Sequence, residues 1–174
     1  MTNERVLEIL REAGVLLEGH FLLTSGRHSN KYLQCAKIFQ YAKYSEELCK
    51  ALAEKYADEG IELVIGPAIG AIQMTYEVSR HLGVKNIFAE RDNGVMTLRR
   101  GFTIEPNQKV LVVEDVVTTG GSVREVIEIV KGADGLEVGA CFGGDNAEVE
   151  FGRLGAGHVD RDACRHGQGR SDQS

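Results

Sequence analysis

The spacing of apolar residues changes along the chain, and each change predicts a different kind of element. Four apolar residues near the N-terminus share one face of a helix: Val6, Ile9, Leu10 and Ala13. Thr2 or Asn3 can cap this helix, and Gly14 ends it. Residues 45–58 repeat the helical spacing, so they predict a second helix.

Two short β-like runs, residues 21–23 and 32–35, lie between these helices. Residues 24–30 between the runs include Ser, Gly and Asn, which are typical of turns. The pattern therefore predicts two strands separated by a turn beside the N-terminal helix.

From residue 63 onward, strand-like and helical patterns alternate. Four short runs predict strands and two amphipathic stretches predict helices: strands at 63–65, 86–89, 109–113 and 137–142, and helices at 71–82 and 122–131. The strand runs are continuously apolar, which is typical of a parallel sheet covered on both faces. The predicted fold class is α/β, with a central parallel sheet flanked by helices. Ligands of such sheets bind at the carboxyl ends of the strands.

Length and charge limit the class of partner. The 174 residues suffice for one domain, and 43% hydrophobic and 26% charged residues are ordinary for a globular protein. The formal net charge of −6 provides no basic surface for nucleic acid or for an anionic membrane. We therefore expect neither partner.

The cellular compartment is predicted from the N-terminus and the cysteines. No apolar run is long enough to span a bilayer, and the N-terminal helix carries Glu4 and Glu8, unlike a secretory leader. The four cysteines contain no Cys-x-x-Cys pair, which argues against a disulfide framework or a zinc site. We expect a cytoplasmic protein with reduced thiols.

Residues 110–122 combine a buried strand, two acids and a loop of glycines and hydroxyls. Glu114 and Asp115 stand where the strand emerges, and Gly120 and Gly121 allow the backbone to approach a ligand closely. Backbone N–H groups of this loop and the start of the following helix form a cradle for an anion. Three hydroxyls add donors to phosphate oxygens: those of Thr118, Thr119 and Ser122.

The two acids repel phosphate, so they must serve another part of the ligand. The vicinal hydroxyls of a ribose fit, because each can donate a charge-assisted hydrogen bond to a carboxylate. The sequence contains no Gly-x-x-x-x-Gly-Lys-[Ser/Thr] loop and no Gly-x-Gly-x-x-Gly after a strand. Residues 110–122 therefore predict a pocket for a ribose 5-phosphate, and with it a phosphoribosyl-transferring enzyme.

Residues 110–122 closely resemble the phosphoribosyl-diphosphate motif of type I phosphoribosyltransferases. Three further segments resemble the orotate branch of that family: 17–29 its N-terminal hood, 66–72 its pyrophosphate-side loop and 90–102 its mobile loop. The resemblance implies transfer of the phosphoribosyl group from phosphoribosyl diphosphate to orotate, giving orotidine 5′-monophosphate and pyrophosphate in pyrimidine synthesis. It also implies Mg²⁺, bound mainly through the substrate, and a homodimer in which the mobile loop reaches the partner's site.

The same resemblance assigns functional roles to residues of these segments. Catalysis falls on Asp115, Glu114, Arg99 and Arg100. Phosphoribosyl diphosphate binding falls on Glu114, Asp115, Val116, Val117, Thr118, Thr119, Gly120, Gly121, Ser122 and Arg91. Orotate binding falls on Thr118, Ser25 and Tyr32.

The C-terminal part departs from the family pattern. Residues 1–151 are expected to form one domain, with a hood made mainly by residues 1–40, whereas residues 152–174 lack apolar periodicity and are expected to be disordered. Asn146 follows Asp145 where the family has an arginine for the orotate carboxylate. A shifted reading frame or a degenerated gene end after about residue 131 would account for this change.

Two other functions remain open from the sequence. One is phosphoribosyl transfer to a different base through the same sugar site. The other is a non-catalytic regulator that binds phosphoribosyl diphosphate, and it is disfavoured because the chain has no basic patch or added DNA-binding domain.

Overall fold

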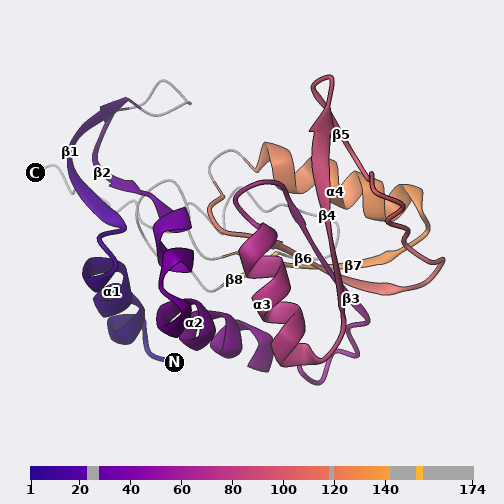
Figure 1. The fold of residues 1–174 in the computed structure, drawn as a ribbon, viewed down its shortest axis with the longest axis horizontal. Coiled ribbons are helices and arrows are strands. Elements are labelled where there is room, and N and C mark those ends of the chain that lie inside the picture. The colour runs from indigo at the N-terminus through magenta and orange to yellow at the C-terminus, as the bar shows by residue number, and fades with distance from the viewer. Residues whose placement is uncertain (23–27, 118–119, 142–151, 155–174) are drawn as a thin grey trace, which may run out of the picture.

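The structure is a computed structural model that describes residues 1–22, 28–117, 120–141 and 152–154. A six-stranded sheet in the order β5-β4-β3-β6-β7-β8 forms its centre, and a two-stranded sheet, β1-β2, stands apart from it (Figure 1). The helices lie on both faces of the large sheet, with α1, α2 and α3 on one side and α4 on the other (Figure 1). This arrangement confirms the predicted α/β class.

The N-terminal elements follow the predicted pattern with shifted ends. Helix α1 spans Asn3–Glu12, and the Thr2 side chain caps it by accepting a hydrogen bond from the Arg5 N–H at 3.3 Å. Strands β1 (Leu16–Leu22) and β2 (His28–Leu33) pair antiparallel. A 3₁₀ helix, η1, covers Cys35–Gln40, and α2 covers Ala42–Glu54.

The central strands are parallel, as predicted. Strand β3 (Leu63–Pro67) pairs with β4 (Lys85–Asp92) on one side and with β6 (Lys109–Glu114) on the other, and β6 pairs with β7 (Leu136–Cys141). Two crossover helices connect them: α3 (Ile72–Leu82) between β3 and β4, and α4 (Gly121–Gly132) between β6 and β7. Both sheet edges are antiparallel, which the sequence pattern did not predict.

Alternate residues of β6 enter two separate cores. Leu111 and Val113 pack with Val64 against the helices α1, α2 and α3. Val110 and Val112 pack on the opposite face against α4. Because both faces are covered, the strand has no solvated side, which explains its continuous apolar run.

Two short edge strands extend the sheet beyond the predicted strands. Strand β5 (Val95–Thr97) forms a hairpin with β4, joined by Asn93 and Gly94, whose φ angles of 51° and 87° suit a two-residue hairpin turn. Strand β8 (Gly152–Leu154) pairs antiparallel with β7. Residues 155–174 of the predicted tail lie outside the described part of the chain.

Within the described residues, none of the helices is long and apolar enough to span a bilayer.

Candidate active site

Strand β6 delivers two acids to its carboxyl end, as the sequence predicted. Val110–Val113 of this strand are fully buried, and Glu114, its last residue, has only 7% of its surface exposed. Asp115 follows directly and is half-buried; its Oδ1 accepts a hydrogen bond from the Val116 N–H at 3.0 Å. The buried strand thus fixes the backbone position of both carboxyls.

Burial changes the protonation of the first acid. It raises the pKa of Glu114 to about 9, helped by a hydrogen bond with Asp115 and by repulsion from the Asp115 charge. Two adjacent carboxyls in a partly dry site do not both ionise readily. Burial and the neighbouring Asp115 therefore favour the protonated form of Glu114 in the free protein.

The loop after β3 lies against this acidic pair. A Cβ atom placed on Gly70 would come within 3.0 Å of Asp115 Oδ1 and 3.1 Å of Oδ2. The loop is attached to the neighbouring strand by the Ala68 N–H, which donates to the Ala89 carbonyl at 2.6 Å, and the Ala68–Ile69 peptide is cis. The structure therefore brings residues 66–72 together with Glu114 and Asp115, two segments that the sequence linked only through the resemblance.

A second glycine of that loop is required by packing. A Cβ on Gly66 would lie 2.6 Å from Thr75 Oγ1 and 2.7 Å from the Val113 carbonyl oxygen. Glycine allows β3, β6 and α3 to approach this closely, just below the loop.

The opposite side of the acids is the start of α4. Gly120 caps this helix with φ 73° and ψ 12°, a left-handed conformation that favours glycine, as the sequence predicted. Val117 is buried, and Gly121 and Ser122 begin the helix. Thr118 and Thr119 lie outside the described residues. Free N–H groups and the positive end of the dipole make this helix start suitable for an anion.

The three arginines that the resemblance assigned to the site each face a carboxylate partner in this structure. Arg91 Nη1 lies 2.8 Å from Glu125 Oε2 of α4, and it donates to the Gly94 carbonyl at 2.9 Å. Arg100 is bonded to Glu90 at 3.0 Å and 3.2 Å. Arg99 Nη1 lies 3.9 Å from Asp92 Oδ1.

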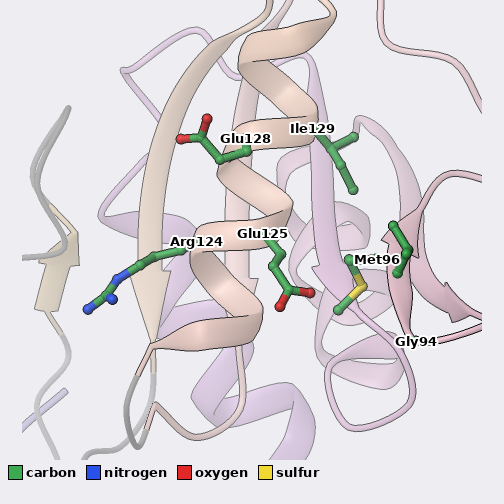
Figure 2. A pocket seen from close by; sticks show the side chains of 7 residues that line it. Gly94, Met96, Arg124, Glu125, Glu128 and Ile129 are labelled. Carbon is green, nitrogen blue, oxygen red and sulfur yellow. The ribbon is translucent and has the colours of Figure 1, made fainter.

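No hydrogen bond or ion pair within the described residues joins these arginines to the acidic pair. A groove of about 540 Å³ separates the β4–β5 hairpin from α4, and Val95, Met96 and Ile129 supply its apolar lining. Figure 2 shows Glu125 on the side of α4 that faces this hairpin, whereas Arg124 points away from it. The hairpin residues therefore approach the helix after the phosphate loop rather than the acids themselves.

The residues expected at orotate are only partly described. Tyr32 lies on β2 with 40% of its surface exposed, and its ring centroid is 5.5 Å from that of Phe21. No hydrogen bond or ring contact in the described part of the chain links Tyr32 to Glu114 or Asp115. Ser25 and the Asp145–Asn146 pair lie outside the described residues.

Sequence reasoning missed the carboxylate partners of the arginines. Glu125 lies 34 residues from Arg91 in sequence, and Glu90 lies ten residues from Arg100, so neither pairing follows from local spacing. The Asn93-Gly94 turn was the available signal, because a hairpin there folds residues 95–100 back along β4.

Comparison with known proteins supplies a family. A family model described as a phosphoribosyl transferase domain matches residues 37–148. The orotate phosphoribosyltransferase of Pelotomaculum thermopropionicum is 59% identical over 140 residues, which cover 80% of this chain and 74% of that protein. The orotate phosphoribosyltransferase of Thermoanaerobacter sp. is 57% identical over 153 residues, which cover 87% of this chain and 80% of that protein.

A solved structure shares the fold. The crystal structure of orotate phosphoribosyltransferase from Aeropyrum pernix matches with a TM-score of 0.65 at 21% identity, covering 82% of this chain and 84% of that one.

Proposed function

Because the chain belongs to the orotate phosphoribosyltransferases of the phosphoribosyltransferase family, we infer that it transfers the phosphoribosyl group of phosphoribosyl diphosphate to orotate. The products are orotidine 5′-monophosphate and pyrophosphate, in pyrimidine biosynthesis. The observation that carries this inference in the structure is the acidic pair at the end of β6, with the Gly70 loop on one side and the start of α4 on the other.

The acids hold the sugar. The ribose hydroxyls donate to the carboxyl oxygens of Glu114 and Asp115, while the 5-phosphate accepts from N–H groups and hydroxyls of residues 118–122. Val116 packs against one core of the sheet and Val117 is buried in the other, which anchors the chain that leads to these residues. Displacement at the anomeric carbon passes through an oxocarbenium-like state, whose positive charge the neighbouring Asp115 carboxylate stabilises.

The leaving diphosphate needs positive charge on the other side of the reacting carbon. Arg91 and the Arg99–Arg100 pair are the sources of positive charge that we propose for this side, because guanidinium binds phosphate oxygens bidentately. Ser25, Tyr32 and Thr118 are proposed for orotate.

The residues fit a Mg²⁺ ion that arrives with the substrate. No group of three or more His, Cys, Asp or Glu side chains within the described residues is arranged to hold a metal alone. Mg²⁺ is commonly bound by one or two carboxylates together with substrate phosphates, and Asp115 beside the open Gly70 position suits such a site. The ion supplies charge that stabilises the leaving diphosphate.

A homodimer is part of the proposal. In support of it, the loop arginines bind carboxylates of the β4–β5 region and of α4 rather than the acids of their own chain. If the loop serves the partner's site, mixing Asp115→Asn subunits with Arg99→Gln subunits will regenerate intact sites and restore activity. Mixtures that stay as inactive as the separate variants would contradict this arrangement.

We also propose that residues 1–151 form the catalytic domain and that the protein works in the cytoplasm. Two cysteines, Cys35 and Cys49, are buried as thiols rather than joined in disulfides, which suits a reducing compartment.

A base-selection assay tests the function. The purified protein, phosphoribosyl diphosphate and Mg²⁺ are combined separately with orotate, uracil, adenine and hypoxanthine, and nucleotide formation is followed by chromatography. We expect orotidine 5′-monophosphate and no comparable product from the other bases. A preference for another base would identify a different transferase, and binding of phosphoribosyl diphosphate without turnover of any base would identify a regulator.

A further inference from the structure

Two adjacent arginines, Arg99 and Arg100, follow β5, and a tight turn separates their environments. The Phe102 N–H donates to the Arg99 carbonyl at 3.0 Å, which closes the turn. Its central residues, Arg100 and Gly101, have φ angles of 59° and 75°. A non-glycine residue adopts such a backbone angle at a cost in conformational energy, and contacts of the Arg100 side chain offset that cost.

Arg100 is held by two neighbours, Glu90 and Phe88. Its Nε and Nη2 atoms donate to the two carboxylate oxygens of Glu90 at 3.0 Å and 3.2 Å, and only 18% of the Glu90 side chain is exposed. The guanidinium carbon lies 5.6 Å from the centre of the Phe88 ring. Phe88 in turn meets Phe102 edge-on, with 5.3 Å between the ring centroids. Arg100 therefore ties the end of the turn to strand β4.

Arg99 has a much weaker attachment. Its recorded ion pair is a 3.9 Å contact from Nη1 to Asp92 Oδ1, and the two side chains are 49% and 50% exposed. A long, solvated ion pair of this kind contributes little to stability and is screened by salt. The Arg99 guanidinium is thus available to a competing anion.

The two arginines differ in the ion pair that each must break to bind a diphosphate. Bidentate recognition of phosphate uses the same fork of N–H donors that Arg100 already gives to Glu90. Moving Arg100 would leave a mostly buried carboxylate without its partner, which is costly. Moving Arg99 leaves only the solvent-exposed carboxylate of Asp92 without its partner.

We propose that Arg99 alone of this pair binds the diphosphate, and that Arg100 is a positioning residue that, with Glu90, holds the turn so that Arg99 faces the ligand. This assignment rests on the proposed phosphoribosyl transfer. It divides between two residues a role that the sequence assigned to both.

Five variants of the full-length protein test the division: Arg99→Gln, Arg100→Gln, Arg100→Lys, Glu90→Gln and the double variant Glu90→Gln/Arg100→Gln. Arg11→Gln, an exposed arginine of α1, controls for the loss of one positive charge. Calorimetry with inorganic pyrophosphate and Mg²⁺ measures the affinity, thermal denaturation measures the fold, and steady-state kinetics measures kcat and KM.

Arg99→Gln is expected to lower pyrophosphate affinity at least about tenfold, the loss of a charge-assisted contact, with an unchanged melting temperature. Arg100→Gln and Glu90→Gln are expected to lower kcat by similar factors, and the double variant is expected to be no worse than either single one, because both remove the same contact. Arg100→Lys should not rescue kcat, since lysine keeps the charge but not the fork.

Three results would overturn the assignment. One is a tenfold affinity loss in Arg100→Gln with Glu90→Gln unaffected, which would make Arg100 the ligand. Another is wild-type affinity in Arg99→Gln. The third is a higher kcat in Glu90→Gln, which would make Glu90 a restraint that Arg100 must leave. Because pyrophosphate affinity is measured without a base, the first two outcomes remain separate from failure of the protein to turn over orotate.

Discussion

Replacing Glu114 with glutamine is expected to stabilise the ligand-free protein increasingly as the pH rises. Glu114 is buried at the end of β6, and burial beside Asp115 raises its pKa to about 9. Glutamine has nearly the shape of a protonated glutamate and cannot ionise. The variant therefore avoids the cost of keeping this carboxyl neutral, or of ionising it, inside the sheet edge.

The size of the effect follows from proton linkage. The unfolded chain releases this proton near the ordinary value of 4.5, whereas the folded protein keeps it to about 9. Between these values the folded state binds more protons, so the free energy of unfolding falls as the pH rises. Each pH unit lowers the free energy of unfolding by at most about 1.4 kcal/mol. A rise from about pH 6 to about pH 8 therefore lowers the free energy of unfolding of the wild type by up to roughly 3 kcal/mol relative to that of Glu114→Gln.

Urea denaturation of both proteins at the two pH values measures this difference. Glu54→Gln, at the exposed end of α2, controls for the change of charge. The gap between Glu114→Gln and wild type should widen with pH, while the gap for Glu54→Gln should not. Equal gaps at both pH values would refute the reasoning, because they would mean that Glu114 ionises normally in the folded protein.

Three further substitutions test the neighbourhood of the acids. Gly66→Ala should destabilise the protein by about 1–3 kcal/mol in urea denaturation, because its Cβ would lie 2.6 Å from Thr75 Oγ1. The control Gly132→Ala, whose Cβ meets nothing within 4 Å, should cause no loss of stability. Gly70→Ala should lower kcat/KM for phosphoribosyl diphosphate several-fold with an unchanged melting temperature, because its Cβ crowds Asp115; unchanged kinetics would remove this loop from the site. Asp115→Asn should lower kcat at least about tenfold while the fold survives, since it removes a charge that acts in the transition state, and an unchanged kcat would exclude that role.

The parts of the fold that local chemistry determines were predictable from sequence. Strand β6 is a run of apolar, mostly β-branched residues, which suits a strand buried on both faces. Glycine at position 120 allows the positive φ before α4, and Asn93-Gly94 is a residue pair typical of a two-residue hairpin turn.

Contacts between distant segments were not predictable in this way. The closeness of Gly70 and Asp115 depends on β3 and β6 being neighbours in a parallel sheet, which periodicity alone does not determine. Strand β5 has only three residues and pairs at an antiparallel edge, so it carries too little pattern to be recognised. The pairing of Arg100 with Glu90 likewise depends on the β4–β5 hairpin, which brings the two residues together.

A crystal structure of the protein with phosphoribosyl diphosphate and Mg²⁺ tests the central claim most directly. We predict the ribose hydroxyls on the carboxyls of Glu114 and Asp115, and the 5-phosphate on the N–H groups of residues 118–122 at the start of α4. A phosphate bound elsewhere, with the turn before α4 empty, would contradict the account.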